Sequence, residues 1–225
     1  MKEEHNTIDF VDSFQGSDVV IENKETVYQG FFKIDKYQVR HPLFNGGVSD
    51  IVQRELMDRG NAAAIVPYDP LNDTVVLIEQ FRIGALAAKA EHVWQVEIVA
   101  GVIDPGEKPE GVAYRECQEE AGITPKNIQK IMTYFPSSGG CSERIALFIG
   151  QVDSTQAKGI HGLAVENEDI RVQVVKRETA FKWIEQGIIE NAASVIGLQW
   201  LQMNYKNLQH TWNTQKTDKT KVKSE

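Results

Sequence analysis

The sequence is poor in cysteine, and its two cysteines, Cys117 and Cys141, show no CxxC spacing. A structural zinc site is therefore not expected, because such sites are built from closely spaced thiolate pairs. One disulfide could join the two cysteines, but a reduced, cytoplasmic setting is the simpler interpretation. The five histidines are scattered and form no ligand pair at helical spacing, which argues against a histidine-based metal site.

Long apolar runs and an excess of positive charge are also missing. No stretch approaches the length needed to span a bilayer, and residues 1–10 lack the features of a secretory signal, so we expect no membrane partner. The net charge of -8 argues against a nucleic-acid partner, since clustered Lys and Arg would be needed to neutralise its phosphates. Hydrophobic residues make up 41% of the 225 residues, as in an ordinary globular protein with a sizeable core.

The hydrophobic pattern predicts strands mixed with a few helices, and therefore an α+β or layered α/β domain. A long polar loop is expected over 153–169, and loops of that length usually have a function. We expect three segments: an N-terminal strand segment (1–58), a main domain (59–210) and a flexible polar tail (211–225). The predicted strands are 19–21, 26–28, 31–34, 37–39, 48–57, 62–67, 74–81, 93–100, 128–134, 145–152 and 171–175, and the predicted helices are 109–121, 177–186 and 192–208.

Chemistry is concentrated in residues 101–123, which read GVIDPGEKPEGVAYRECQEEAGI. Positions three and four apart share one face of a helix, so Glu116, Glu119 and Glu120 project as one carboxylate cluster. Such a cluster is tolerated when hard divalent cations such as Mg²⁺ or Mn²⁺ bridge it, and these ions also bind substrate phosphates. Arg115, four residues before Glu119, could orient that carboxylate, and Glu107 could brace the same network.

An ExxEE run taken alone is usually a solvated acidic helix face. The full pattern is far more restrictive, because it fixes glycines, carboxylates and an arginine over 23 positions. It resembles the Nudix hydrolase box at every fixed position, with Cys117 in a slot where Ile, Leu or Val is commoner. The resemblance implies the α/β/α layered Nudix fold, with a mixed sheet between helices and an N-terminal antiparallel strand segment.

The resemblance extends across most of residues 17–208 to the bacterial ADP-ribose pyrophosphatase branch of that family. It rests on YQGFF at 28–32, HPLFNG at 41–46, VLIEQ at 76–80, GLAVENEDIR at 162–171 and NAASVIGLQWL at 191–201. It implies hydrolysis of ADP-ribose to AMP and ribose 5-phosphate with Mg²⁺, and more than one ion per site. It also implies a homodimer whose N-terminal strands exchange between subunits.

Site residues follow from the resemblance position by position. It implies metal ligands at the Ala100 carbonyl, Glu116, Glu120 and Glu168, and a catalytic base at Glu166. A polar loop could deliver such a base only when substrate is in place, although a merely solvated acidic loop is the alternative. Glu119 is the other candidate for the base, as in some other Nudix branches.

The resemblance also implies substrate contacts, with Phe31 and Phe32 of the partner subunit stacking near the adenine; aromatic rings suit adenine and arginines suit phosphate. Phe31 and Phe32 could instead be core residues of a strand, and Arg82 an ordinary surface charge. The branch commonly has a proline where this sequence has Ser138, which puts the geometry of that loop and substrate selectivity in question. The implied contacts are Phe31, Phe32, Arg54, Glu55, Arg59, Arg82, Val102, Ser137, Ser138, Gly139 and Glu143.

Two rival functions remain open. The box handles only the pyrophosphate, so another nucleoside diphosphate sugar such as GDP-mannose could be the substrate. The domain could also be a non-catalytic ligand-binding module with a Nudix fold, but such modules often lose box carboxylates and all are present here.

Overall fold

A computed structural model describes the backbone of residues 13–221, and the side chains in that range apart from Glu166 and residues 213–221. The chain forms two compact units. The N-terminal unit comprises the chain up to Arg59 together with Gly139–Ser142, and the larger unit comprises Gly60–Ser138 and the chain from Glu143 onward.

The N-terminal unit is a three-stranded antiparallel sheet in the order β1-β2-β3, formed by Val20–Gln29, Lys33–Arg40 and Val52–Asp58. Residues 139–142 join it, because the N–H of Met57 donates to the carbonyl of Gly140. The predicted short strands 19–21 and 26–28 are one strand, β1, and 31–34 and 37–39 fall largely within β2. Two bulges in β1 interrupt the alternation that sequence reasoning depends on.

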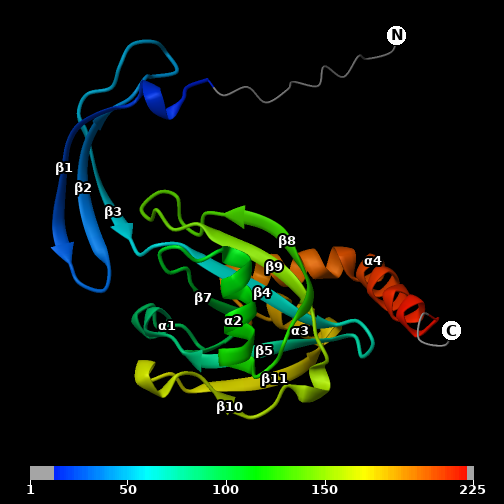
Figure 1. Ribbon diagram of the computed structural model, residues 1–225. Helices are drawn as coiled ribbons and strands as arrows, with labels where there is room; N and C mark the ends of the chain where they lie inside the picture. The colour runs from blue at the N-terminus through cyan, green and yellow to red at the C-terminus, as the bar shows by residue number, and fades with distance from the viewer. Residues whose placement is uncertain (1–12, 222–225) are drawn as a thin grey trace, which may run out of the picture. The chain divides into compact units, whose positions relative to one another are not determined.

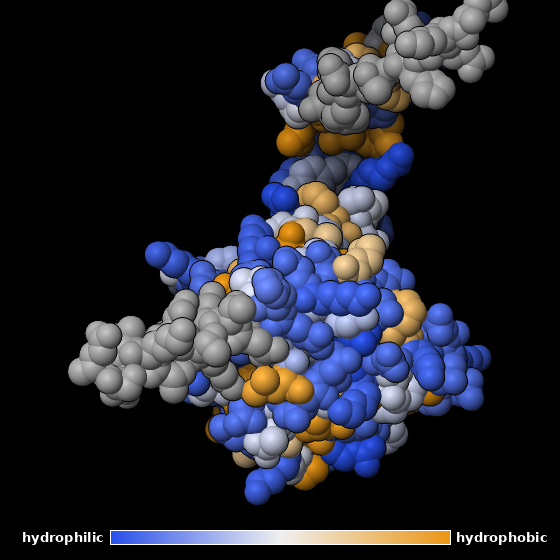
Figure 2. Space-filling view, turned by 90° about the vertical axis from the view of Figure 1, so that its right-hand side faces the viewer, coloured by the Kyte–Doolittle hydropathy of each residue, from blue (hydrophilic) through white to orange (hydrophobic). Residues whose placement is uncertain are grey.

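Much of the apolar surface of the N-terminal unit is exposed. Every residue of β1 is exposed, and Figure 2 shows hydrophobic surface on this unit in orange. Monomeric soluble proteins rarely expose large contiguous apolar patches, so such surface is typical of a binding or association face.

The larger unit is built on a mixed sheet in the order β10-β11-β5-β4-β9-β8. Strand β6 pairs with β5 and β7 pairs with β4, so the continuous segment β6–β7 fills the gap where β4 and β5 diverge. The strands are β4 (Ala62–Asp69), β5 (Thr74–Phe81), β6 (Trp94–Glu97), β7 (Val99–Val102), β8 (Lys126–Tyr134), β9 (Ile145–Gln151), β10 (Ile160–His161) and β11 (Ile170–Lys176).

Helices cover both faces of this sheet, which confirms the predicted α/β/α layering. Figure 1 shows α2 on one face and α3 and α4 on the other. Along β5, Val76 and Ile78 pack into the core beneath α2, whereas Val75 and Leu77 pack into the core beneath α4. The helices are α1 (Ile83–Ala87), α2 (Pro109–Ala121), α3 (Arg177–Glu185) and α4 (Ala192–Lys221), with short 3₁₀ turns η1 (Gly16–Asp18), η2 (Ser154–Gln156) and η3 (Ala164–Glu166).

Helix α4 runs further than the sequence predicts. The expected helix ends at 208 and a frayed tail begins at 211, but α4 continues to Lys221. Trp212 explains part of the extension, because its indole is 1% exposed and lies against the ring of Tyr68 with 6.5 Å between centroids. Helix α1 is not predicted either. Within residues 13–221, no helix is both long and apolar enough to cross a bilayer.

Asp69 ties the start of the long loop 153–169 to the end of β4. Its carboxylate accepts hydrogen bonds from the backbone N–H and hydroxyl of Ser154, at 3.0 and 2.8 Å, and from Asn72 Nδ2 at 2.8 Å. Burial raises the pKa of Asp69, but the hydrogen bonds from Asn72 and Ser154 outweigh it and leave that pKa below its ordinary value. The loop that carries Glu166 and Glu168 is therefore anchored at its first turn.

Replacing Asp69 should cost stability in a pH-dependent way. We expect Asp69→Asn to lower the free energy of unfolding at pH 7 by about 1–3 kcal/mol, because buried donors lose an ionised acceptor. The folded-state pKa lies below the unfolded one, so this contribution is present above the unfolded pKa and disappears as pH falls through the folded value. Urea titrations of both proteins should therefore diverge at pH 7 and converge at low pH; a difference that stays constant would contradict this.

Candidate active site

Helix α2 lies in the segment 101–123, called the acidic box below, and it begins and ends where the sequence predicts. Pro109 occupies its first turn, where a missing N–H costs nothing, and Gly122 ends it in a left-handed conformation at φ 63°. His161 lies over Gly122, and a Cβ there would come within 2.4 Å of its ring. The end of α2 and the long loop are thereby held together, and the Gly162 N–H also donates to the Glu119 carbonyl at 3.3 Å.

The carboxylates of Glu116 and Glu120 lie against β7. The backbone N–H of Ala100 donates to Oε2 of Glu120 at 3.0 Å. The side chain of Glu116 crosses Gly101 so closely that a Cβ at that position would meet its Oε1 at 1.7 Å. The structure therefore brings together three of the four predicted metal-ligating residues, and it gives Gly101 a steric role.

A methyl group at Gly101 should displace Glu116 and disable the site. We expect Gly101→Ala to lower kcat about 100-fold, because a shift of about 1 Å in a catalytic group can have that effect. Gly111→Ala is the matched control: nothing lies within 4 Å of its Cβ position, and alanine favours a helix by about 0.5–1 kcal/mol. Steady-state rates of both variants test this prediction, and thermal unfolding shows whether each variant folds. Equal rates for the two variants would contradict the steric role of Gly101.

Arg115 is the centre of an ion-pair network on the exposed side of the box. Its Nη1 lies 2.8 Å from Oε2 of Glu119 and 2.9 Å from Oε1 of Glu116, and its Nε lies 3.4 Å from Oε1 of Glu107. The predicted contacts of Arg115 with Glu119 and with Glu107 are both present. Glu107 is itself fixed by accepting a hydrogen bond from the N–H of Asp104 at 3.0 Å.

Burial raises the pKa of the two inner carboxylates, Glu116 and Glu120. It raises the pKa of Glu116 to about 7, against the opposing charge of Arg115. It raises the pKa of Glu120 to about 8, against the hydrogen bond from Ala100 and the charge of Arg82. Two buried carboxylates beside a backbone strand are a donor set that suits a hard divalent cation, so the residues present fit the implied metal.

Glu168 is near this pair but is not joined to it. Its charge acts on both Glu116 and Glu120, yet its Oε2 accepts a hydrogen bond from the N–H of Leu163 at 3.2 Å. Accordingly, among the described side chains no three His, Cys, Asp or Glu groups are arranged to hold a metal ion. The backbone of Glu166 ends η3, and the side chain of this residue, the predicted base, lies outside the described residues.

Arg82 is not an ordinary surface charge. Its Nε donates to Oε2 of Glu97 at 2.9 Å, its Nη2 forms an ion pair with the same oxygen at 2.7 Å, and Glu97 is 3% exposed. Sequence reasoning did not single out Glu97. The signal was a lone acidic residue within the otherwise apolar run Val96–Val99, where burial without a partner would be costly.

The predicted aromatic contacts lie in the N-terminal unit. Phe31 is 88% exposed, so it is not a core residue, and its ring meets that of Phe32 edge-on at 5.0 Å. The guanidinium of Arg59 lies 5.7 Å from the centre of the Phe32 ring. Arg54 and Glu55 are exposed on β3 and help to line a hollow of about 310 Å³ in the same unit.

The remaining predicted contacts are divided between the units. In the larger unit Val102 ends β7 and is 39% exposed, Ser137 and Ser138 are exposed in the loop after β8, and Glu143 is buried. Gly139 belongs to the N-terminal unit.

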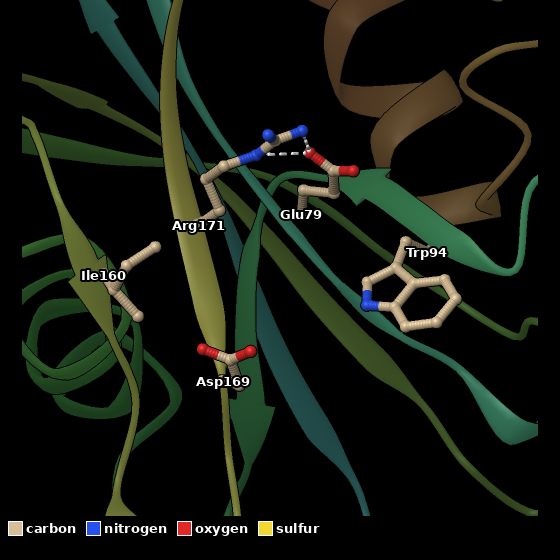
Figure 3. Close-up of a pocket in the computed structure, with 5 residues that line it drawn as sticks. All are labelled: Glu79, Trp94, Ile160, Asp169 and Arg171. Carbon is tan, nitrogen blue, oxygen red and sulfur yellow. Dashed lines mark hydrogen bonds and ion pairs between the residues drawn. The ribbon is translucent and has the colours of Figure 1, made fainter.

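A different cavity, of about 350 Å³, lies on the larger unit and is lined by none of the predicted residues (Figure 3). Its lining residues are Glu79, Trp94, Ile160, Asp169 and Arg171. Glu79 follows Leu77 by two positions on β5, so it projects to the face of the sheet opposite α2. There it pairs with Arg171, as the dashed lines in Figure 3 show.

Comparisons with known proteins point to one family. The NUDIX domain matches residues 58–191. An ADP-ribose pyrophosphatase of Haemophilus influenzae is 52% identical over 204 residues, which cover 90% of this chain and 94% of that protein. An ADP-ribose pyrophosphatase of Escherichia coli K12 is 52% identical over 200 residues, which cover 89% and 95%.

More distant similarities agree with this result. A GDP-mannose pyrophosphatase of Escherichia coli is 35% identical over 153 residues, which cover 68% of this chain and 79% of that protein. A crystal structure described as an ADP compounds hydrolase superposes with a TM-score of 0.64 over 86% of this chain and 98% of its own, at 21% identity. At that identity the superposition speaks for the fold alone.

Proposed function

The chain belongs to the Nudix family, and from that premise we propose that it hydrolyses the pyrophosphate bond of ADP-ribose to AMP and ribose 5-phosphate. The observation that carries the proposal is the pair of buried carboxylates, Glu116 and Glu120, packed against β7. The substrate follows from the 52% identity to ADP-ribose pyrophosphatases over most of both chains.

Divalent metal dependence is general in this family, and Mg²⁺ is the ion we propose, with more than one ion per site. Glu116, Glu120, Glu168 and the Ala100 carbonyl would hold it, with Mn²⁺ as a substitute. When bound, the metal supplies Lewis acidity that offsets the charge developing on the phosphate oxygens. For Glu168 to take part, its carboxylate would exchange the N–H of Leu163 for the metal.

The chain's own residues orient the reactants and move the proton. Arg82 would bind the diphosphate, because a guanidinium presents two parallel donors to phosphate oxygens. Glu166 would take a proton from the water that attacks one phosphorus, while the bond from that phosphorus to the bridging oxygen breaks. Arg115 would hold Glu119 and Glu116 in place through the ion pairs described above.

The N-terminal unit would supply the adenine contacts and the dimer interface. Phe31 is exposed on a unit rich in exposed apolar side chains, so it is available to stack on a base. We therefore propose a homodimer with exchanged N-terminal strands, in which Phe31, Phe32, Arg54, Glu55 and Arg59 contact substrate bound to the partner. Light scattering should give the mass of a dimer, and a monomeric mass would refute this part. A cytoplasmic location belongs to the same proposal.

Product analysis with and without Mg²⁺ tests the activity. We expect AMP and ribose 5-phosphate from ADP-ribose with Mg²⁺, and at most traces of either in EDTA. GDP-mannose is the comparison substrate, because a GDP-mannose pyrophosphatase is also similar to this chain. Faster turnover of GDP-mannose would move the assignment to that substrate, and tight binding of ADP-ribose without any AMP release would favour a non-catalytic module.

A further inference from the structure

The larger unit buries a carboxylate outside the acidic box, that of Glu97 at the end of β6. Both of its oxygens are engaged. Oε2 accepts from Nε of Arg82 at 2.9 Å and forms an ion pair with Nη2 at 2.7 Å, and Oε1 accepts from Nδ2 of Asn191 at 2.9 Å. Glu97 is 3% exposed, whereas the side chain of Arg82 is 44% exposed, so one end of the pair is fixed in the interior and the other faces solvent.

Asn191 is itself held in place at the start of α4. Its Oδ1 accepts from the N–H and hydroxyl of Ser194, at 3.2 and 3.3 Å, and the Ser194 hydroxyl accepts from the N–H of Ile98 at 3.0 Å. A chain of hydrogen bonds therefore runs from the beginning of α4 through Glu97 to Arg82. It is closed at the backbone of Ile98, directly after Glu97.

This arrangement uses one edge of the guanidinium and leaves the other available. Nε and Nη2 are committed to Glu97, and among the described residues no hydrogen bond engages Nη1. Glu97, the partner of Arg82, lies three positions before Ala100, whose N–H donates to Glu120, and the charge of Arg82 acts to lower the pKa of Glu120. An arginine that presents its remaining donors next to a metal-binding pair is placed to bind an anionic oxygen.

Stability is a weak explanation for a pair of this kind. Taking Glu97 out of water costs free energy, and for buried ion pairs this cost can exceed the gain from mutual attraction. What the pair provides is a fixed guanidinium, and fixing a long side chain before binding reduces the entropy lost when a ligand arrives.

We propose that Glu97, held by Asn191, is a positioning residue that orients Arg82 toward the diphosphate of the substrate. The proposal rests on the proposed function, because it concerns the binding of that diphosphate. Glu97 touches no reacting atom, and it acts only through Arg82.

Kinetics of the Glu97→Gln variant test the role. We expect KM for ADP-ribose to rise about tenfold while kcat changes less than about threefold, because a binding contact is weakened and the chemistry is intact. In an Arg82→Ala background the same substitution should change kcat/KM less than about twofold, because the arginine side chain through which Glu97 acts is then absent. Independent, additive losses, or an unchanged KM in the single variant, would overturn the proposal.

The controls separate positioning from folding. Glu79→Gln makes the same change on the opposite face of the sheet, where Glu79 pairs with Arg171 (Figure 3), and it should leave KM unchanged. Asn191→Asp keeps the acceptor for Ser194 but removes the donor to Glu97, and it should raise KM in the same direction. If Glu97→Gln does not fold, Asn191→Asp carries the test, and an unchanged KM there refutes the proposal.

A second readout needs no activity. In the free protein, hydrogen exchange of the Arg82 Nε–H, followed by NMR, should be slow in the native chain and in Glu79→Gln. It should be about tenfold faster or more in Glu97→Gln, where the charged acceptor is lost. Equal exchange rates overturn the positioning role. If the native chain releases no AMP from ADP-ribose, but its Arg82 Nε–H still exchanges more slowly than that of Glu97→Gln, only the proposed function is refuted.

Discussion

The Glu120→Gln variant is expected to lose hydrolysis of ADP-ribose while folding at least as stably as the native chain in EDTA. Glu120 is 3% exposed, and burial raises its pKa to about 8, so its charge is costly in the metal-free fold. A neutral amide removes that cost and still accepts the hydrogen bond from Ala100. We expect kcat to fall about 1,000-fold or more, because a metal's Lewis acidity contributes several kcal/mol to such reactions.

Thermal unfolding measures both the stability of the metal-free protein and its response to the metal. In the native chain Mg²⁺ should raise the unfolding temperature, since an ion that binds only the folded state stabilises it. In Glu120→Gln that rise should be lost or much reduced. Glu110→Gln is the matched control, because Glu110 lies exposed in the first turn of the same helix and should leave both rate and metal response unchanged. A Glu120→Gln protein that remains active, or is stabilised by Mg²⁺ to the native extent, would exclude Glu120 as a ligand.

The Glu166→Gln variant is expected to retain binding and lose turnover. Removal of a general base typically lowers kcat about 10²–10⁴-fold, and KM should stay near its native value. Glu119→Gln should have a much smaller effect, because the carboxylate of Glu119 is held by the guanidinium of Arg115 at 2.8 Å. The measurement is kcat and KM for both variants under saturating Mg²⁺.

The reverse pattern would reassign the base. A Glu166→Gln enzyme with near-native turnover, together with an inactive Glu119→Gln, would transfer the role to Glu119 on α2. Loss of activity in both variants would contradict the assignment of a single base. Circular dichroism of each variant separates these results from failure to fold.

The sequence predicted the structure most accurately in α2, where local backbone preferences are sufficient. Its ends follow from Pro109 and Gly122, whose backbone preferences act without help from the rest of the fold. The contacts of Arg115 with Glu119 and Glu107 were predictable for the same reason, since they connect residues close in sequence.

Features that depend on distant residues were not predictable in this way. The extension of α4 is supported by the packing of Trp212 on Tyr68, which only the tertiary structure brings together. The partnership of Glu97 with Arg82 and Asn191 joins three separate segments. Strand β1 was missed as a unit because its exposed residues show no buried face and its bulges shift the register.

The contact between Ala100 and Glu120 also bears on how the site assembles. These residues are 20 positions apart, so a short loop brings β7 and α2 together. Glu168 lies about fifty positions further along the chain, and closing a longer loop costs more entropy. We therefore expect the helical half of the site to form earlier in folding and to open later than the loop half. Local fluctuations would then release Glu168 while the fold persists, so the lifetime of a complete site would be shorter than that of the fold.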